Sequence, residues 1–119
     1  MDARPKTIFC DVDGTLIHHY GDLMLQISNK AKLLPGVLEK FNEWDKKGYN
    51  LILTTGRRES MRELTERQLK ECGLFWDQLI MGVGGGHRVI INDLKSGGTE
   101  PTAIAVNVER NVGMSHLEI

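Results

Sequence analysis

Two aspartates stand two residues apart, directly after the apolar run Ile-Phe-Cys at residues 8–10. Residues two apart on a strand point the same way, so Asp11 and Asp13 can face one site at the end of that strand. Ionised carboxylates resist leaving water unless a cation or hydrogen bonds compensate them. Such a pair suits a hard divalent cation, a nucleophile and a proton carrier, which together make phosphoryl-transfer chemistry. The alternative is an ordinary turn, since Asp, Gly and Thr are common turn residues.

Two later segments also carry polar side chains at the ends of apolar runs. Leu-Ile-Leu-Thr-Thr-Gly-Arg occupies residues 51–57, and Val-Ile-Ile-Asn-Asp occupies residues 89–93. Together with Asp-Val-Asp-Gly-Thr-Leu at residues 11–16, these motifs resemble, in order, the signature of the haloacid dehalogenase superfamily, whose members are mostly magnesium-dependent phosphatases. The resemblance covers residues 8–93.

The resemblance implies a role for each of three aspartates. Asp11 would be the nucleophile that becomes an aspartyl-phosphate, and one of its oxygens would bind Mg²⁺. Asp13 would protonate the leaving oxygen and later activate water, while its backbone carbonyl would be a second metal ligand. Asp93 would complete the metal site, because carboxylates, a carbonyl and waters suit an octahedral Mg²⁺. Many relatives carry two acids where this chain has Asn-Asp, and others have Gly-Asp.

By the same resemblance, Thr55 would hold a phosphoryl oxygen through its hydroxyl, with Thr54 as the alternative. A structural β-branched threonine is also open. Gly14 would let the chain turn sharply beside the phosphate, although a turn glycine explains it equally well. Gly56 and Arg57 follow, and we expect them to contact phosphate. A cation near the start of a helix is disfavoured by the helix dipole, so Arg57 indicates an anion nearby.

The lysine that relatives carry before the last strand is missing from its expected position in this chain. Relatives place a Lys or Arg before the last strand to neutralise the charges of the phosphate and the nucleophile. Arg88 is the nearest cation here, and its guanidinium can bind phosphate bidentately. It stands five residues before Asp93, about 16 Å away in a regular strand, so the preceding loop must fold back for Arg88 to serve. Lys70 is the second candidate and Lys95 the third, and a plain surface arginine explains Arg88 equally well.

The elements that must position these residues alternate along the chain. Strands are predicted over residues 8–11, 49–55, 79–81, 88–92 and 102–108, and the first is expected to be buried on both faces. One helix is predicted between Pro35-Gly36 and Gly48, and a second after a capping box formed by Ser60 and Glu63. This order predicts an α/β fold with a Rossmann-like parallel sheet of about five strands, flanked by helices and binding ligands at the strands' carboxyl edge.

The spacing of the motifs leaves no room for a cap domain. Residues 16–34 suffice for a hairpin flap only, so the chain resembles the capless branch of the superfamily. Such an enzyme takes a large substrate or closes its site with a neighbouring subunit, and a homo-oligomer is therefore one expectation. His18, His19 and Tyr20 lie in the flap, where they could touch substrate, but exposed flap residues are the favoured prediction. Residues 82–87 are too few for a crossover helix; a flexible glycine connector is the favoured prediction, and a phosphate cradle is the alternative.

Composition agrees with one domain over residues 1–119. The chain has 15 basic and 16 acidic residues and a net charge of −1, so no basic tract indicates nucleic acid or an anionic membrane. The longest apolar stretches are strand-sized, and no signal-peptide region precedes the first one, so a cytoplasmic protein is expected. The two cysteines, Cys10 and Cys72, are predicted to be small buried hydrophobes in a reducing compartment.

The expected function is a Mg²⁺-dependent phosphomonoesterase that acts through an aspartyl-phosphate on a sugar phosphate or another small phosphorylated metabolite. A phosphatase for nucleic-acid 3′ ends is the alternative within the fold, and the neutral charge counts against it. A catalytically silent phosphate-binding domain is the alternative of another class, supported only by the displaced lysine.

Overall fold

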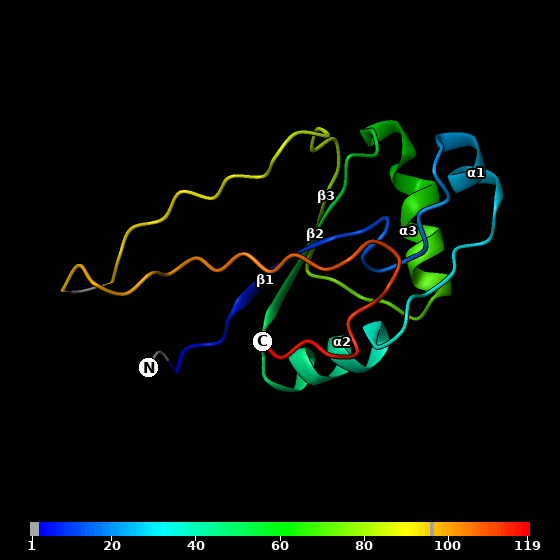
Figure 1. The fold of residues 1–119 in the computed structure, drawn as a ribbon. Coiled ribbons are helices and arrows are strands. Elements are labelled where there is room, and N and C mark those ends of the chain that lie inside the picture. The colour runs from blue at the N-terminus through cyan, green and yellow to red at the C-terminus, as the bar shows by residue number, and fades with distance from the viewer. Residues whose placement is uncertain (1–2, 96) are drawn as a thin grey trace.

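The computed structural model describes residues 3–95 and 97–119, and a parallel sheet lies at its centre (Figure 1). The strands β1 (Thr7–Asp11), β2 (Asn50–Thr54) and β3 (Gln78–Ile80) lie in the order β1-β2-β3. Their register sets Cys10 beside Leu53 and Leu53 beside Leu79, and this row of side chains is buried. The predicted α/β parallel sheet is confirmed, with three strands among the described residues instead of about five.

Helix α2 (Val37–Lys46) follows the prediction. It begins after Gly36 and ends just before Gly48, and both glycines have positive φ. Its buried side chains recur at helical spacing and join the same core as the buried sheet row. They are Val37, Phe41 and Trp44. None of the helices in the described part of the chain has the length and apolar character needed to cross a membrane.

Helix α3 (Arg62–Glu71) begins differently from the prediction. The 3-10 turn η1 (Glu59–Met61) precedes it, and Met61 occupies the N-cap with no side-chain hydrogen bond. The predicted capping box is therefore wrong, because Ser60 lies inside the turn. The buried side chains of α3 include two polar ones, Thr65 and Gln68, alongside Leu69. A helix face that buries polar groups must give them partners.

One face of the sheet is open. Cys10 and Leu53 belong to one buried core with the apolar residues of α2 and α3, whereas Phe9 on the opposite face is 56% exposed and Ile80 is also exposed. The prediction that the first strand is buried on both faces is therefore wrong. Its alternation of exposed and buried positions is that of a strand with only one covered face.

Residues 16–34 form the flap, which carries a short helix at its tip. Ile17 bridges Leu33 in antiparallel fashion, and the His18 N–H donates to the Lys32 carbonyl at 2.8 Å. Helix α1 (Leu23–Ser28) is capped by Asp22, whose carboxylate accepts from the Leu25 N–H at 2.9 Å. The flap is thus closed at its base and helical at its tip.

The predicted strands over residues 88–92 and 102–108 are wrong, because neither segment is a strand in the structure. The described residues between 84 and 108 instead form an extended, two-limbed projection, called here the arm, which runs away from the sheet (Figure 1, yellow to orange). Near its tip the Lys95 N–H donates to the Glu100 carbonyl at 2.9 Å. The short connection after β3 holds no crossover helix to carry the chain back for another parallel strand.

Candidate active site

Asp11 ends β1 beside Thr54, the last residue of β2. Its side chain is 44% exposed; Oδ2 accepts a hydrogen bond from the Thr15 hydroxyl at 3.2 Å, and Nη2 of Arg88 lies 3.8 Å from Oδ1. Burial raises the pKa of Asp11 above its ordinary value, while the Thr15 hydrogen bond and the charge of Arg88 act in the opposite direction. The sheet edge therefore presents a half-exposed carboxylate with a cation facing it.

Asp13 is held by three donors. Arg57 donates from Nη2 to Oδ1 at 2.7 Å and from Nε to Oδ2 at 2.9 Å, a two-point ion pair whose guanidinium is buried. Gln26 of the flap helix donates from Nε2 to Oδ1 at 2.9 Å. Because every one of these contacts uses a carboxylate oxygen as acceptor, the arrangement is that of an ionised side chain, the form in which a carboxylate can accept a proton.

Helix α3 supplies the remaining partners of Arg57. Nη1 of Arg57 donates to the Thr65 hydroxyl at 3.0 Å and to Oε1 of Gln68 at 2.7 Å. Gln68 in turn donates from Nε2 to the Gln26 carbonyl at 3.1 Å. A buried charge is tolerated when its hydrogen bonds are satisfied in this way. The resulting set, called here the Asp13 network, joins the end of β1, the flap and α3. Its members are Asp13, Gln26, Arg57, Thr65 and Gln68.

Three members of the network carried no motif in the sequence. Gln26, Thr65 and Gln68 are all buried, which is unusual for polar side chains. The available signal was the spacing of Thr65 and Gln68, three residues apart and hence on one helix face. Leu64, an apolar residue of the same helix, is only half-buried.

The position of Arg57 near the start of a helix predicted an anion close to its side chain. In this structure that anion is the carboxylate of Asp13, whereas contact between Arg57 and phosphate stays a prediction. Thr55 is buried, and its hydroxyl oxygen accepts from the Arg57 N–H at 3.1 Å. A Cβ at Gly56 would lie 3.0 Å from the Val83 carbonyl oxygen, so the close approach of the loop after β3 accounts for a glycine there. Phosphate-binding roles for Thr55 and Gly56 stay predictions.

Arg88 reaches Asp11 because the loop after β3 folds back. The Gly82 N–H donates to the Arg57 carbonyl at 2.7 Å, and the Val83 N–H donates to the Thr55 carbonyl at 2.9 Å. Gly82 has a φ of 74°, which permits the turn. Since the residues after Arg88 form no strand, the separation expected from a regular strand does not apply. Among the candidate cations, Arg88 is the one that the structure sets against Asp11.

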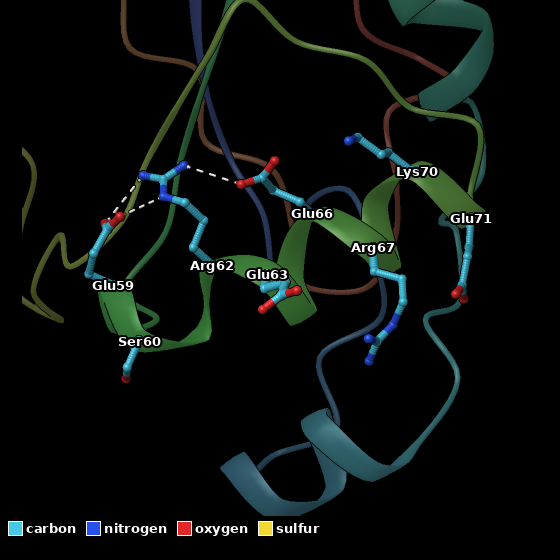
Figure 2. A pocket seen from close by; sticks show the side chains of 8 residues that line it. All are labelled: Glu59, Ser60, Arg62, Glu63, Glu66, Arg67, Lys70 and Glu71. Carbon is cyan, nitrogen blue, oxygen red and sulfur yellow. Dashed lines mark hydrogen bonds and ion pairs between the residues drawn. The ribbon is translucent and has the colours of Figure 1, made fainter.

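Lys70 lies elsewhere, on the outer side of α3. It lines an open hollow of about 800 Å³ whose walls are charged side chains of η1 and α3 (Figure 2). Arg62 bridges Glu59 and Glu66 across this hollow. Neither Asp11 nor Asp13 lines it, so it is separate from the candidate active site. Lys95 lies near the tip of the arm.

The oxygen atoms at the sheet edge fit Mg²⁺ but supply only a few ligands to it. Asp11 offers a half-exposed carboxylate, while the carboxylate of Asp13 is occupied by Arg57 and Gln26, so Asp13 has its backbone carbonyl to offer. Mg²⁺ is commonly bound by one or two carboxylates together with waters and substrate phosphates. The described residues contain no group of three His, Cys, Asp or Glu side chains able to hold a metal, so Asp93 is not brought to Asp11 and Asp13. A metal-binding role for Asp93 stays a prediction.

The segment after the arm is hydrogen-bonded to the chain that follows β1. Asn111 donates its N–H to the carbonyl of Gly14 at 2.8 Å, and its side-chain amide exchanges two hydrogen bonds with the backbone of His19. Asn111 has a φ of 66°, a conformation that asparagine tolerates better than most residues. His18, His19 and Tyr20 are consequently half-buried, and the prediction that they are exposed is wrong.

Cys10 is buried beside Asp11, as predicted, and Cys72 is half-buried. Burial and the neighbouring charge of Asp11 raise the pKa of Cys10 to about 12. The thiolate is therefore suppressed at neutral pH, and Cys10 packs next to the site without being a nucleophile in it.

Comparison with known proteins agrees with this geometry. Residues 8–85 match the haloacid dehalogenase-like hydrolases, a span that includes Asp11, Asp13 and residues 54–57. Two chains, one from a structure of the Pnkp1/Rnl/Hen1 complex and one from the Pnkp1/Rnl/Hen1 RNA repair complex, are 31% and 32% identical to this chain, with TM-scores of 0.58 and 0.57. Both matches cover 71% of this chain but only 30% and 28% of the other, so this chain spans under a third of their length.

A protein from Vibrio cholerae shares the fold at lower identity. It is 19% identical, with a TM-score of 0.51, and the match covers 74% of this chain and 80% of that protein. No curated protein matches the sequence significantly.

Proposed function

The chain belongs to the haloacid dehalogenase-like hydrolases, and we propose that it is a phosphatase that hydrolyses phosphomonoesters with Asp11 as nucleophile. One observation carries the proposal: the half-exposed carboxylate of Asp11 at the end of β1 faces the guanidinium of Arg88, with Nη2 at 3.8 Å from Oδ1. A carboxylate that substrate can reach and a cation beside it are what attack on a phosphate dianion requires.

The reaction has two steps. An oxygen of Asp11 attacks phosphorus, the bond from phosphorus to the ester oxygen breaks, and Asp13, which must take up a proton from solvent before this step, gives it to the departing alkoxide. Water then attacks phosphorus and loses a proton to Asp13, the bond from phosphorus to Asp11 breaks, and inorganic phosphate leaves. Both oxygens of Asp13 accept from donors in the structure, so its contacts with Arg57 or Gln26 must shift when it carries the proton.

Charge is neutralised by the chain and by Mg²⁺. The residues that would hold Mg²⁺ are Asp11, through its carboxylate, and Asp13, through its backbone carbonyl, with Asp93 as the further predicted ligand. When bound, Mg²⁺ offsets the negative charge that gathers around the phosphate. Arg88 adds a permanent positive charge opposite Asp11, and Thr55 would donate its hydroxyl to a phosphoryl oxygen.

The proposed substrate class is a small phosphorylated metabolite such as a sugar phosphate. Gln26 on the flap reaches Asp13, so the flap lies close enough to the site to cover a small molecule. A phosphatase for nucleic-acid ends is the second candidate. The observation that favours it is the 31–32% identity to chains of a complex described as acting in RNA repair.

Hydrolysis assays with purified protein test the proposal. We expect phosphate release from p-nitrophenyl phosphate with Mg²⁺ and its loss with a chelator, and we expect Asp11→Asn to lose several orders of magnitude in turnover. A panel of sugar phosphates assayed beside an oligonucleotide with a 3′-phosphate separates the two substrate classes. Release from the oligonucleotide alone would favour the second candidate, and no release from any phosphomonoester would contradict both.

A further inference from the structure

The arm exposes apolar side chains that a compact domain would bury. From residue 84 to residue 107 every described residue except Lys95 is exposed. Ile91 is 91% exposed, Val89 is 79% exposed, and Ile104 and Val106 on the returning limb are also exposed. On each limb the two named residues are two apart, so an extended backbone sets them on one face. Contiguous exposed apolar surface of this kind marks an interaction site.

The backbone of the arm is also open to pairing. Away from the tip, the described limb residues are extended but form no strand ladder with one another or with the sheet. Extended segments of this kind present rows of N–H and C=O groups that are templates for pairing with another chain. The arm is fixed at both roots, because Val83 and Asn111 bond to the backbone of Thr55 and Gly14.

A second uncovered surface lies on the sheet. The face of β1 and β3 that the helices leave open exposes Phe9 and Ile80. The arm and the open sheet face are thus two exposed apolar surfaces, separate from the exposed apolar side chains of α1 at Leu23, Met24 and Leu25.

The chain exposes more surface than a compact monomer of the same mass. The chain exposes 8026 Å², whereas a compact monomer of 13.4 kDa exposes about 6,500 Å². Its radius of gyration is 15.1 Å, against about 13.5 Å for a compact chain of this length. Each copy thus exposes an excess of about 1,500 Å². An interface that covered half of this excess on each of two copies would bury about 1,500 Å² in total, which is the size of a stable protein–protein interface.

We propose that the arm and the open sheet face form the interface through which a second copy of this chain associates. The arm holds two basic and two acidic residues between residues 84 and 108, so its charges balance. A balanced, apolar surface suits an identical copy, in which each charge can meet its opposite, better than a polyanion such as nucleic acid or an anionic membrane. Arg88, which lies in the arm, faces Asp11, so the interface borders the candidate active site.

Sedimentation equilibrium of the full chain over a wide concentration range tests the proposal. We expect a mass of about twice 13.4 kDa, or a higher multiple, that falls toward one copy on dilution. Ile91→Asp should raise the dissociation constant at least about thirtyfold. Met24→Asp on α1 is the matched control, because Met24 is 72% exposed but lies outside both surfaces. The control should associate like the wild-type chain, and circular dichroism checks that both variants fold.

Hydrogen exchange locates the interface without relying on one variant. Amides of residues 84–108 should exchange slowly in the associated wild-type chain and fast in Ile91→Asp. A wild-type chain that stays monomeric at the highest concentration would overturn the proposal, as would an oligomer whose arm amides exchange fast. A monomer that floats with phosphatidylcholine vesicles would identify a lipid surface as the occupant and overturn it too.

Discussion

Asp13 and Arg57 are joined by two hydrogen bonds of 2.7 and 2.9 Å, although 44 positions separate them in the chain. The pair ties the residue that follows β1 to the turn that follows β2. Because Thr65 and Gln68 of α3 accept hydrogen bonds from the same guanidinium, the orientation of the proposed acid and base depends on that helix. Variants of this pair report on stability and on catalysis together.

Arg57→Lys is expected to weaken both. Lysine keeps the charge but lacks the planar fork, so it cannot bond both oxygens of Asp13 and also Thr65 and Gln68. We expect the free energy of unfolding to fall by about 1–3 kcal/mol and catalytic efficiency to fall at least about tenfold. Urea unfolding and steady-state kinetics measure the two effects. Arg58→Lys, at the exposed neighbouring position, is the control; equal behaviour of the two variants would argue against the role of Arg57.

Gln26→Leu tests whether the flap positions Asp13. Leucine keeps a similar size but removes the amide that donates to Asp13 and accepts from the Tyr20 N–H. We expect kcat to fall more than KM rises, because Asp13 acts in the chemical steps rather than in substrate binding. Ser28→Ala in the same short helix should leave both constants near the wild-type values. A loss confined to KM would instead indicate that Gln26 contacts substrate.

Arg88→Ala and Lys70→Ala separate the two cations that the sequence left open. Arg88 faces Asp11 at 3.8 Å, whereas Lys70 lines the hollow on the outer side of α3. We expect Arg88→Ala to lose at least about tenfold in catalytic efficiency and Lys70→Ala to be silent. Kinetics on one substrate under identical conditions decide the matter, and a silent Arg88→Ala would remove Arg88 from the mechanism.

Asp11→Asn is expected to stabilise the metal-free protein at neutral pH. Burial raises the pKa of Asp11 above 3.8, so the folded state disfavours its charge. The stability that the neutral carboxyl contributes is complete below pH 3.8 and is lost as the pH rises through the raised pKa. Urea unfolding with a chelator should therefore show Asn more stable than Asp at pH 7, with the difference shrinking as the pH falls. A difference that does not change with pH would contradict the effect of burial.

The elements nearest the chemistry were predictable because local signals fixed them. The apolar runs that end at Asp11 and Thr54 became β1 and β2, and the spacing of Val37, Phe41 and Trp44 became α2. Parallel strands then bring their carboxyl ends to one edge without further information. The resemblance to the superfamily rested on the motifs at residues 11–16, 51–57 and 89–93.

The arm and the Asp13 network were not predictable for a different reason. The apolar pattern of residues 88–92 is that of a strand, but a strand needs a neighbour, and none of the described residues pairs with this segment in a sheet. The network depends on contacts between residues up to 44 positions apart, and buried glutamines leave no periodic signal. The position of Arg88 beside Asp11 likewise follows from how a glycine loop folds, which composition alone does not determine.

The most direct test of the central claim is to trap the phosphorylated enzyme. The wild-type chain is mixed with a phosphomonoester and Mg²⁺, quenched in acid, digested and analysed by mass spectrometry for a phosphoryl group bound to carboxylate. We predict the group on Asp11 of the peptide that contains residues 8–15, and its absence in Asp11→Asn. A phosphoryl group on another residue, or full turnover by Asp11→Asn, would contradict the account.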